Sequence, residues 1–469
     1  MTGRIVIVGA GMGGLTSAIR LARAGLSVRV VEARAAAGGL ASGFEQDGFT
    51  FDAGPYILLD RPGLEWAFQS LGLELTEHLT LRPIEDVYEV SSSQGASVRF
   101  HMDLEETASG LDRNWPGSGR RYEQFVAETR TIYRRISPVL RVSQPGLRDL
   151  LHGMAWMHLP FLLKPLGSIL ARTGLPPTVV DAIAIWTHAA GQTVDQAPSP
   201  MAFVPVLIHT AGAFYPDGGM AAIPRALAKA AAAAGVEFRF ETKVRKILCE
   251  RGRVRGVETD QGEFIAADAV VSNYSGVGTY LELIKEAPSR VRERLRKLPL
   301  QSPGACAYLA VQGEAKPPYL HFRLPGRGRY CRLLATPAVI APELRNNGWW
   351  PARLIAPMNH TVAQRTRLEK QREYLDEIVR ENWWREHVSQ YRVLATRVPA
   401  EWGAQFNLYR DSMNPVVTAR SMRDGYLAHR SPYVRGLYLA GSSTHPGQWV
   451  SFCAISGVLA AESVLEDLD

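Results

Sequence analysis

The chain has 469 residues and a mass of 51.7 kDa, enough for two or three domains with buried cores. Hydrophobic residues make up 46% and charged residues 21%, which excludes wholesale disorder, a collagen helix and a coiled coil. The mean hydropathy is −0.09 and no run of about 18 apolar residues occurs, which excludes a polytopic membrane protein. The net charge is +7, but the basic residues are scattered, which favours a solvated surface over a nucleic-acid site.

The four cysteines lie far apart in the chain, which does not suit a zinc site or a redox-active cysteine pair. So few cysteines are typical of a reduced, intracellular compartment. A strand-like run begins already at Arg4, which leaves no room for a signal peptide. We therefore expect a cytoplasmic protein.

Residues 4–35 predict a strand, a glycine turn, a helix and a second strand. The first strand is Ile5–Val8, the helix covers Leu15–Ala24, and the second strand is Ser27–Val31. Gly25 suits the position just after a helix, where the chain turns back. Such a βαβ unit predicts a parallel sheet and hence an α/β fold.

Residues 61–214 have a different character, because Pro and Gly interrupt amphipathic segments. The stretch 154–172 is the most apolar, with Lys164 as the only charge before Arg172. It is too short and too broken by proline to span a bilayer. Three interpretations stay open: a lid over an apolar pocket, a segment lying on a membrane surface, and a buried pair of helices.

The α/β pattern returns at residues 219–275, after which residues 286–429 are mixed again. A long polar helix is predicted near Thr361–Glu381. The other predicted elements are a helix over Ala221–Ala234, strands at 237–240, 244–249, 253–259, 269–272, 305–311 and 437–441, and a final helix over Val450–Asp469.

Gly9, Gly11 and Gly14 form the pattern G-x-G-x-x-G. Alone this pattern is weak, but here it follows a strand, opens a helix and precedes Glu32 at the end of the next strand. Gly9 permits the tight turn, Gly11 lets a pyrophosphate approach the backbone, and Gly14 allows close packing of helix on strand. This context predicts a dinucleotide site.

The helix that follows the turn would bind the phosphates through the free amides of Met12 and Gly13. Glu32 would accept hydrogen bonds from ribose hydroxyls, and its charge disfavours a 2′-phosphate. FAD or NAD is therefore favoured over NADP. We expect a Rossmann-type FAD/NAD(P)-binding domain, made of residues 1–60, 215–285 and 430–469, with an inserted α+β substrate domain, made of residues 61–214 and 286–429.

Two segments resemble the extended FAD fingerprint of the flavin amine oxidase and phytoene desaturase superfamily. They are GGL at 38–40 and GFTFDAGP at 48–55. The resemblance implies that Gly39 and Leu40 pass close to the pyrophosphate and that Pro55 lies near the flavin ring. FAD is therefore the cofactor we expect.

This sequence departs from the superfamily at Leu40, where relatives usually carry Arg or Lys. One phosphate contact of the pattern is therefore missing. Arg34 or a backbone amide would supply it instead.

Further segments resemble the bacterial phytoene desaturase branch, which contains carotenoid desaturases and isomerases. The resemblance implies that the backbone of Val244 receives the adenine and that Gly441 belongs to the closing FAD signature. It also implies that Val450 starts a helix pointing at the flavin pyrimidine, where the helix dipole stabilises reduced flavin. The segments are FYPDGG at 214–219, ETKV at 241–244, ADAVVSN at 267–273 and LYLAGSSTHPG at 437–447.

After the closing signature, carotenoid desaturases usually continue with small residues, whereas this chain has Gln448 and Trp449. Trp449 resembles an aromatic-cage residue of the amine oxidases, or else it packs in the core. Against an amine oxidase, strand 305–311 lacks the lysine that those enzymes place near flavin N5. Gln448 could orient a substrate oxygen, Tyr56 would line the pocket, and His445 is either a general acid or base or a residue that stabilises a turn.

These patterns predict an FAD-dependent desaturase or dehydrogenase of a hydrophobic substrate, either isoprenoid, polyene or polyketide-like. A hydride would leave for flavin N5 and a proton would leave the neighbouring carbon, and an allylic bond would need no strong base. Oxygen or a quinone would accept the electrons, and no metal is expected. Two alternatives remain: a flavin oxidase of a smaller amine or amino-acid-derived metabolite, and a non-redox flavin-dependent isomerase.

Overall fold

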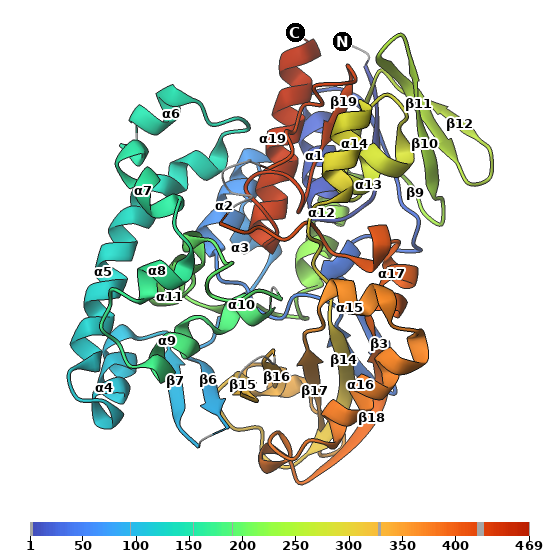
Figure 1. Cartoon of the computed structure of the whole chain (residues 1–469). Helices are drawn as coiled ribbons and strands as arrows, with labels where there is room; N and C mark the ends of the chain where they lie inside the picture. Colours follow the sequence, from blue (N-terminus) through green and yellow to red (C-terminus); the bar gives the residue numbers. More distant parts are fainter. Residues whose placement is uncertain are drawn as a thin grey trace.

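The computed structural model describes residues 3–93, 95–152, 154–189, 191–326, 330–419 and 426–468. A five-stranded parallel sheet lies at one end and a seven-stranded mixed sheet at the other, with helices along one side (Figure 1). The α/β fold class is confirmed. The expected domain boundaries remain a prediction, although the strands of the parallel sheet come from three separated stretches of the chain.

The parallel sheet has its strands in the order 3-2-1-4-5 by chain position. Its three central strands are short runs rich in β-branched residues, and they are almost fully buried because helices cover the sheet. In spatial order they are β9 (Glu237–Arg239), β2 (Ser27–Val31), β1 (Arg4–Val8), β13 (Ala269–Ser272) and β19 (Leu437–Leu439).

The strand order reverses between β1 and β13. At such a point the connections leave in opposite directions, and a crevice opens at the carboxyl ends of the strands. Gly9 follows β1 and Asn273 follows β13. The topology therefore places the predicted glycine turn at the edge of the sheet where ligands bind in this architecture.

Two long helices pack closely on the parallel sheet: α1 (Met12–Arg23) and α19 (Val450–Leu468). A Cβ on Gly457 would lie 2.1 Å from the carbonyl oxygen of Gly13, so only glycine allows the two helices to cross at this distance. The crossing holds the last helix of the chain against the helix of the glycine turn.

The seven-stranded sheet has two different faces. Leu334, Trp350 and Leu354 belong to a core packed against α16 (Leu368–Arg380). The alternate residues of the same strands face the cavity described below, as the two-residue period of a strand requires. In spatial order the strands are β18 (Gln390–Arg397), β14 (Ala305–Gln312), β17 (Trp349–Ala356), β16 (Arg332–Ala335), β15 (Leu320–Leu324), β6 (Asp86–Ser92) and β7 (Ser97–His101).

The smaller elements complete the fold. An antiparallel sheet contains β10 (Val244–Glu250), β11 (Arg253–Thr259) and β12 (Phe264–Ala266), and two-stranded pairs are β3 (Gly43–Gln46) with β4 (Phe49–Asp52) and β5 (Leu81–Pro83) with β8 (Phe214–Pro216). The remaining helices are α2 (Arg61–Ser70), α3 (Leu75–His78), α4 (Leu104–Asn114), α5 (Ser118–Ile136), α6 (Leu147–His152), α7 (Leu159–Leu162), α8 (Leu166–Leu170), α9 (Pro177–Ile183), α10 (Ile185–Ala189), α11 (Phe203–Thr210), α12 (Ala222–Ala233), α13 (Gly276–Gly278), α14 (Ser289–Arg296), α15 (His360–Arg365) and α17 (Pro399–Phe406).

One predicted helix is wrong: the stretch Thr361–Glu381 is not continuous. α15 ends before Thr366, whose backbone is extended, and α16 starts at Leu368. The side-chain Nε2 of Gln371 donates to the carbonyl oxygens of Ala363, at 2.9 Å, and Thr366, at 3.0 Å. These side-chain hydrogen bonds replace the backbone hydrogen bonds that a continuous helix would have formed. Strand β12 was not predicted, and the predicted last helical residue, Asp469, lies outside the described residues.

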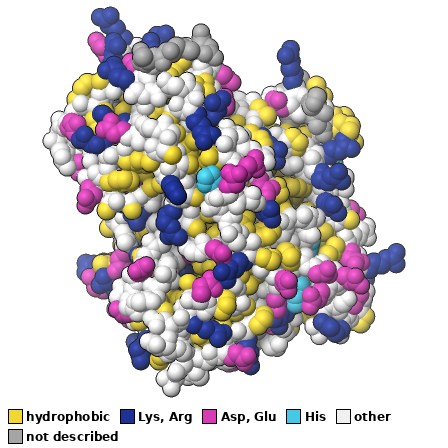
Figure 2. Space-filling view, turned by 180° about the vertical axis from the view of Figure 1, so that it is seen from behind, with side chains coloured by type: hydrophobic (Ala, Val, Ile, Leu, Met, Phe, Trp, Pro, Cys, Tyr) yellow, Lys and Arg dark blue, Asp and Glu magenta, His cyan; other side chains and the backbone are white. Residues whose placement is uncertain are grey.

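Basic and acidic side chains are interspersed over the face seen in Figure 2, as expected for a solvated charged surface. None of the described helices is long and apolar enough to cross a membrane.

Candidate functional site

A cavity of about 540 Å³ runs from the carboxyl edge of the parallel sheet to the seven-stranded sheet. This volume lies in the usual range of sites for small organic molecules. Most predicted site residues line the cavity, although they come from distant parts of the chain. They are Gly9, Gly11, Met12, Gly13, Glu32, Arg34, Gly39, Leu40, Pro55, Tyr56, Val244, Gly441, Gln448, Trp449 and Val450.

Gly14 and His445 are not among the lining residues. A Cβ on Gly14 would lie 2.1 Å from the carbonyl oxygen of Gly9, so this glycine keeps the turn tight rather than facing a ligand. The Nε2 atom of His445 lies 3.0 Å from the carbonyl oxygen of Val139, and burial lowers the pKa of the imidazole. We therefore assign His445 no part in the chemistry.

The glycine turn packs against the side chain of Asn273. Gly9 has a φ of +96°, which only glycine adopts easily. A Cβ on Gly11 or Gly13 would lie 2.6 Å from the Asn273 amide group. Asn273 lines the cavity as well, and sequence reasoning missed it. Its position directly after β13, beside the strand that precedes the turn, is the signal that could have revealed it.

Glu32 is buried at the end of β2. Its carboxylate accepts hydrogen bonds from the backbone amides of Ala10, at 2.7 Å, and Arg34, at 2.9 Å. Each carboxylate oxygen can accept a second hydrogen bond. Glu32 thus fixes the loops on both sides and still has acceptor capacity for a ribose.

Arg34 lies beside the segment in which Leu40 replaces the usual basic residue. Its Nη1 donates to the carbonyl oxygen of Gly39, at 3.1 Å, and to the hydroxyl of Ser42, at 3.2 Å. Its guanidinium also stacks on Phe406, with 4.3 Å to the ring centroid. These contacts hold a positive charge at the wall of the cavity, where a phosphate contact is needed.

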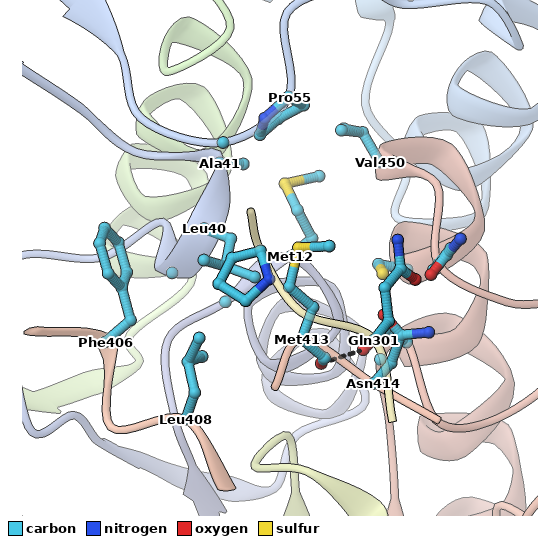
Figure 3. Close-up of a pocket in the computed structure, with 18 of the residues that line it drawn as sticks. Met12, Leu40, Ala41, Pro55, Gln301, Phe406, Leu408, Met413, Asn414 and Val450 are labelled. Carbon is cyan, nitrogen blue, oxygen red and sulfur yellow. Dashed lines mark hydrogen bonds between the residues drawn. The ribbon is translucent and has the colours of Figure 1, made fainter. Parts of the chain in front are cut away.

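Figure 3 shows Met12, Leu40, Pro55 and Val450 gathered around one part of the cavity. Val450 is the first residue of α19, whose first amides have no partners within the helix. The side-chain oxygen of Gln448 is buried and lacks a hydrogen-bond partner among the described residues. A ligand with a hydrogen-bond donor would satisfy it, so this end of the cavity fits a polar ring system.

The loop before Pro55 is held by two charged residues, the half-buried Asp52 and the buried Arg353. The carboxylate of Asp52 accepts hydrogen bonds from the Met220 amide, at 2.7 Å, and the Tyr215 hydroxyl, at 2.8 Å. Burial raises the pKa of Asp52, and these bonds oppose the rise. From β17, Arg353 donates to the carbonyl oxygens of Gly54, at 2.6 Å, and Asp52, at 3.3 Å. A lone arginine in the apolar strand WWPARLIA could have signalled this role, but sequence reasoning did not select it.

The far end of the cavity is apolar. Phe322, Leu333 and Ile355 are neighbours in the sheet register across β15, β16 and β17, and all three line the cavity. Trp186 stacks edge-on against Phe322, with ring centroids 5.5 Å apart. At the other end, Trp449 stacks on Phe452 at 5.0 Å. Aromatic and aliphatic side chains therefore line the far end of the cavity, and an aromatic pair lies at the end of Val450.

Residues 12–308 match the flavin-containing amine oxidoreductase family. The chain belongs to this family. It is an FAD-dependent oxidoreductase, and the glycine turn, Glu32 and the Gln448 oxygen, which has no partner in the part of the chain that the structure describes, fit that cofactor.

The curated relatives include carotenoid-modifying enzymes. A zeta-carotene-forming phytoene desaturase of Myxococcus xanthus is 32% identical over 321 residues, which cover 68% of this chain but only 62% of that protein. A 4,4'-diapolycopene oxygenase of Methylomonas sp. is 25% identical, and the match covers 99% of this chain and 98% of that protein. A hydroxyneurosporene desaturase of Rubrivivax gelatinosus is 27% identical, and the match covers 100% of this chain and 94% of that protein. The expected resemblance to phytoene desaturases is confirmed.

Solved structures show the same fold. An oxidoreductase from Methanosarcina mazei superposes with a TM-score of 0.66 at 19% identity, covering 99% of this chain and all of that chain. A putrescine oxidase bound to putrescine superposes with a TM-score of 0.67 at 16% identity, and the match covers 99% of both chains. At these identities the likeness concerns the architecture alone.

Proposed function

We propose that the protein desaturates a hydrophobic, partly conjugated hydrocarbon chain of the carotenoid class. The observation that carries the proposal is the apolar face made by Phe322, Leu333 and Ile355, which continues the cavity beyond Pro55 and Val450. Relatives named as carotenoid desaturases support it. The substrate would lie along this face, with one C–H bond near the flavin.

Within this proposal, Glu32 binds the ribose and the amides of Met12 and Gly13 bind the phosphates. The backbone of Val244 receives the adenine, and the N-terminus of α19 at Val450 faces the pyrimidine. When bound, FAD supplies the hydride acceptor. The protein contributes orientation, exclusion of water and the positive end of the α19 dipole.

The test uses the purified protein with its FAD and a neutral polyene in detergent micelles, without oxygen. The proposal predicts that the visible flavin absorbance bleaches and that the product is two mass units lighter. Oxygen or a quinone should then restore the absorbance. An unchanged mass with altered chromatographic retention would show isomerisation, and hydrogen peroxide formed from an amine alone would show an amine oxidase.

We expect Trp449→Ala to change substrate selection more than cofactor binding. Removing the indole widens the space beside Val450, so kcat/KM for a bulkier polyene should rise relative to a slender one by about tenfold, the value of roughly one or two methylene groups in an apolar pocket. The FAD dissociation constant should stay within about threefold, because the indole is a wall and not a hydrogen-bonding group. The control is Trp349→Ala, whose indole does not belong to the lining and which should leave the ratio unchanged. An unchanged ratio in Trp449→Ala would place this residue in the core.

We also propose that the segment around α7 rests on an anionic membrane surface. Six of the ten exposed large hydrophobic side chains among the described residues lie between positions 151 and 163. Arg148 and Arg172, both exposed, flank them in the chain. Exposed apolar side chains next to basic ones suit a surface of anionic lipid, from which a hydrophobic substrate could enter. The six are Leu151, Met154, Trp156, Met157, Leu159 and Leu163.

Trp156→Glu should release the protein from vesicles that contain phosphatidylserine, as measured by co-sedimentation. Trp156 is 50% exposed, so the fold should not depend on it. Phe264→Glu is the matched control, because Phe264 is 53% exposed on the distant strand β12. Equal binding of the two variants would contradict the membrane contact.

A further inference from the structure

Asp60 is a buried carboxyl in the cavity wall that sequence reasoning did not select. Its side chain is only 2% exposed, and it lines the cavity together with Gln448, Trp449 and Val450. Its Oδ1 accepts the backbone amide of Gly63 at 3.1 Å, which makes Asp60 the N-cap of α2. The carboxyl therefore lies at the end of the cavity where the reacting bond would be placed.

The carboxyl also contacts the start of the last helix. The hydroxyl of Ser451 donates to its Oδ2 at 2.9 Å. A Cβ on Gly63 would lie 2.0 Å from Oδ2, so a glycine in the first turn of α2 is needed to leave room for this oxygen. The carboxyl is thus fixed between the N-termini of α2 and α19.

The titratable groups around Asp60 come from two further elements. Tyr133, on α5, hydrogen-bonds the carboxyl, and Arg141, in the 3-10 turn Ser137–Arg141, adds a positive charge. Burial raises the pKa of Asp60, while the Ser451 and Gly63 hydrogen bonds, Arg141 and Tyr133 lower it. Such a carboxyl accepts a proton more readily than an exposed one.

We propose that Asp60 is the proton acceptor of the desaturation, an inference that rests on the function proposed above. One C–H bond of the substrate breaks and its electron pair leaves with the hydride to flavin N5. On the neighbouring carbon, the proton passes to a carboxylate oxygen of Asp60, and the electron pair of that C–H bond forms the C=C bond. The substrate is oxidised by two electrons and the flavin is reduced by two.

The charges of the site support this assignment. The hydride brings one negative charge to the flavin, while the proton removes one from the carboxylate. The net charge of a site of low dielectric constant therefore stays the same during the reaction. Tyr133 is half-buried and Arg141 is exposed, so they lead from the carboxyl toward solvent, where the proton can leave once oxygen or a quinone has reoxidised the flavin.

The first test is the pH dependence of turnover in the FAD-loaded enzyme. In the wild type the rate should rise with pH as Asp60 ionises. Asp60→Asn keeps an acceptor for the Gly63 amide but cannot take up the proton, so turnover should fall at least about 100-fold and the rise should disappear. Ser451→Ala removes a donor that favours the ionised form of Asp60. The pKa of Asp60 should therefore increase, and the turnover rate should begin to rise at a higher pH.

The second test needs no substrate and so examines Asp60 apart from the proposed function. Protons taken up during photoreduction of the bound FAD are counted in weak buffer, above the midpoint of the wild-type profile. The wild type should take up two protons per flavin, because the new negative charge raises the pKa of the nearby carboxylate, and Asp60→Asn should take up one.

The matched control is Asp103→Asn. Asp103 caps α4 in the same way, accepting the Glu106 amide at 2.8 Å, but it is exposed. It should leave the rate, the pH profile and the proton count unchanged. If Asp60→Asn keeps the wild-type pH profile and proton count, even with slower turnover, Asp60 is only a helix cap and the proposal is overturned. If the wild type gives no lighter product, the proposed function is wrong. The proton count during photoreduction then shows by itself whether Asp60 takes up a proton when the flavin is reduced.

Discussion

Gly14→Ala should abolish FAD binding. The new Cβ would lie 2.1 Å from the carbonyl oxygen of Gly9, a backbone atom that cannot move without opening the turn. Overpacking of this kind costs up to about 3 kcal/mol, which corresponds to up to about a 150-fold loss of affinity if it falls on the bound turn. The measurement is the FAD content of the purified protein, followed by titration of the apoprotein with FAD.

The control for this variant is Gly110→Ala. Gly110 also lies in a helix, but its Cβ would meet only the Arg113 guanidinium at 3.5 Å, an ordinary contact. Alanine should there stabilise the helix by up to about 1 kcal/mol and leave FAD binding unchanged. Both variants gain the same helix propensity. The difference between their FAD affinities therefore measures the effect of the clash with Gly9 alone. Full FAD occupancy in Gly14→Ala would contradict the packing described for the turn.

Arg353→Met should destabilise the protein and weaken FAD binding together. The variant removes the donors to the carbonyls of Gly54 and Asp52 and leaves the half-buried Asp52 carboxylate without its nearby positive charge. We expect a loss of about 3 kcal/mol in the free energy of unfolding, since breaking one side of a buried charged network costs that much. FAD affinity should fall about tenfold, equivalent to roughly 1.4 kcal/mol, because the loop before Pro55 loses its support.

Denaturant unfolding and FAD titration measure the two effects. Arg392→Met is the control, since Arg392 is exposed on β18, which β14 separates from β17, and its guanidinium stacks on Trp349. A change of roughly 0.5 kcal/mol or less is expected there, as for ordinary surface substitutions. Unchanged FAD affinity in Arg353→Met would show that the loop is held by Asp52 alone.

The α/β part of the fold was predictable because its signals are local. The runs Ile5–Val8 and Ser27–Val31 correspond to β1 and β2 closely, and Gly25 has the positive φ expected after a helix. The break between α15 and α16 could not be predicted, because polar residues continue on both sides of it. There the deciding bonds come from the side chain of Gln371, which only the folded chain brings to the carbonyls.

The candidate site divides in the same manner. The glycine turn and Glu32 lie within one βαβ unit, so their spacing in the sequence reflects their spacing in the site. Asn273 reaches the turn only because β13 pairs with β1. Arg353 reaches Gly54 from a strand about 300 positions away, and Asp60 acquires its setting from Ser451, at the start of the last helix. No local pattern carries such information, although a lone charge in an apolar strand is a usable hint.

The order of strands in the parallel sheet has a consequence for synthesis on the ribosome. β1 and β2 are synthesised early, but the sheet is complete only when β19, at Leu437–Leu439, pairs with β13. At about 5–20 residues per second, roughly 20–80 s of translation separate β2 from β19. During that time the apolar edge of the nascent sheet has no permanent partner, and Gly441 has not yet joined the cofactor cavity. We therefore expect the newborn chain to depend on chaperones and to acquire FAD only near the end of translation.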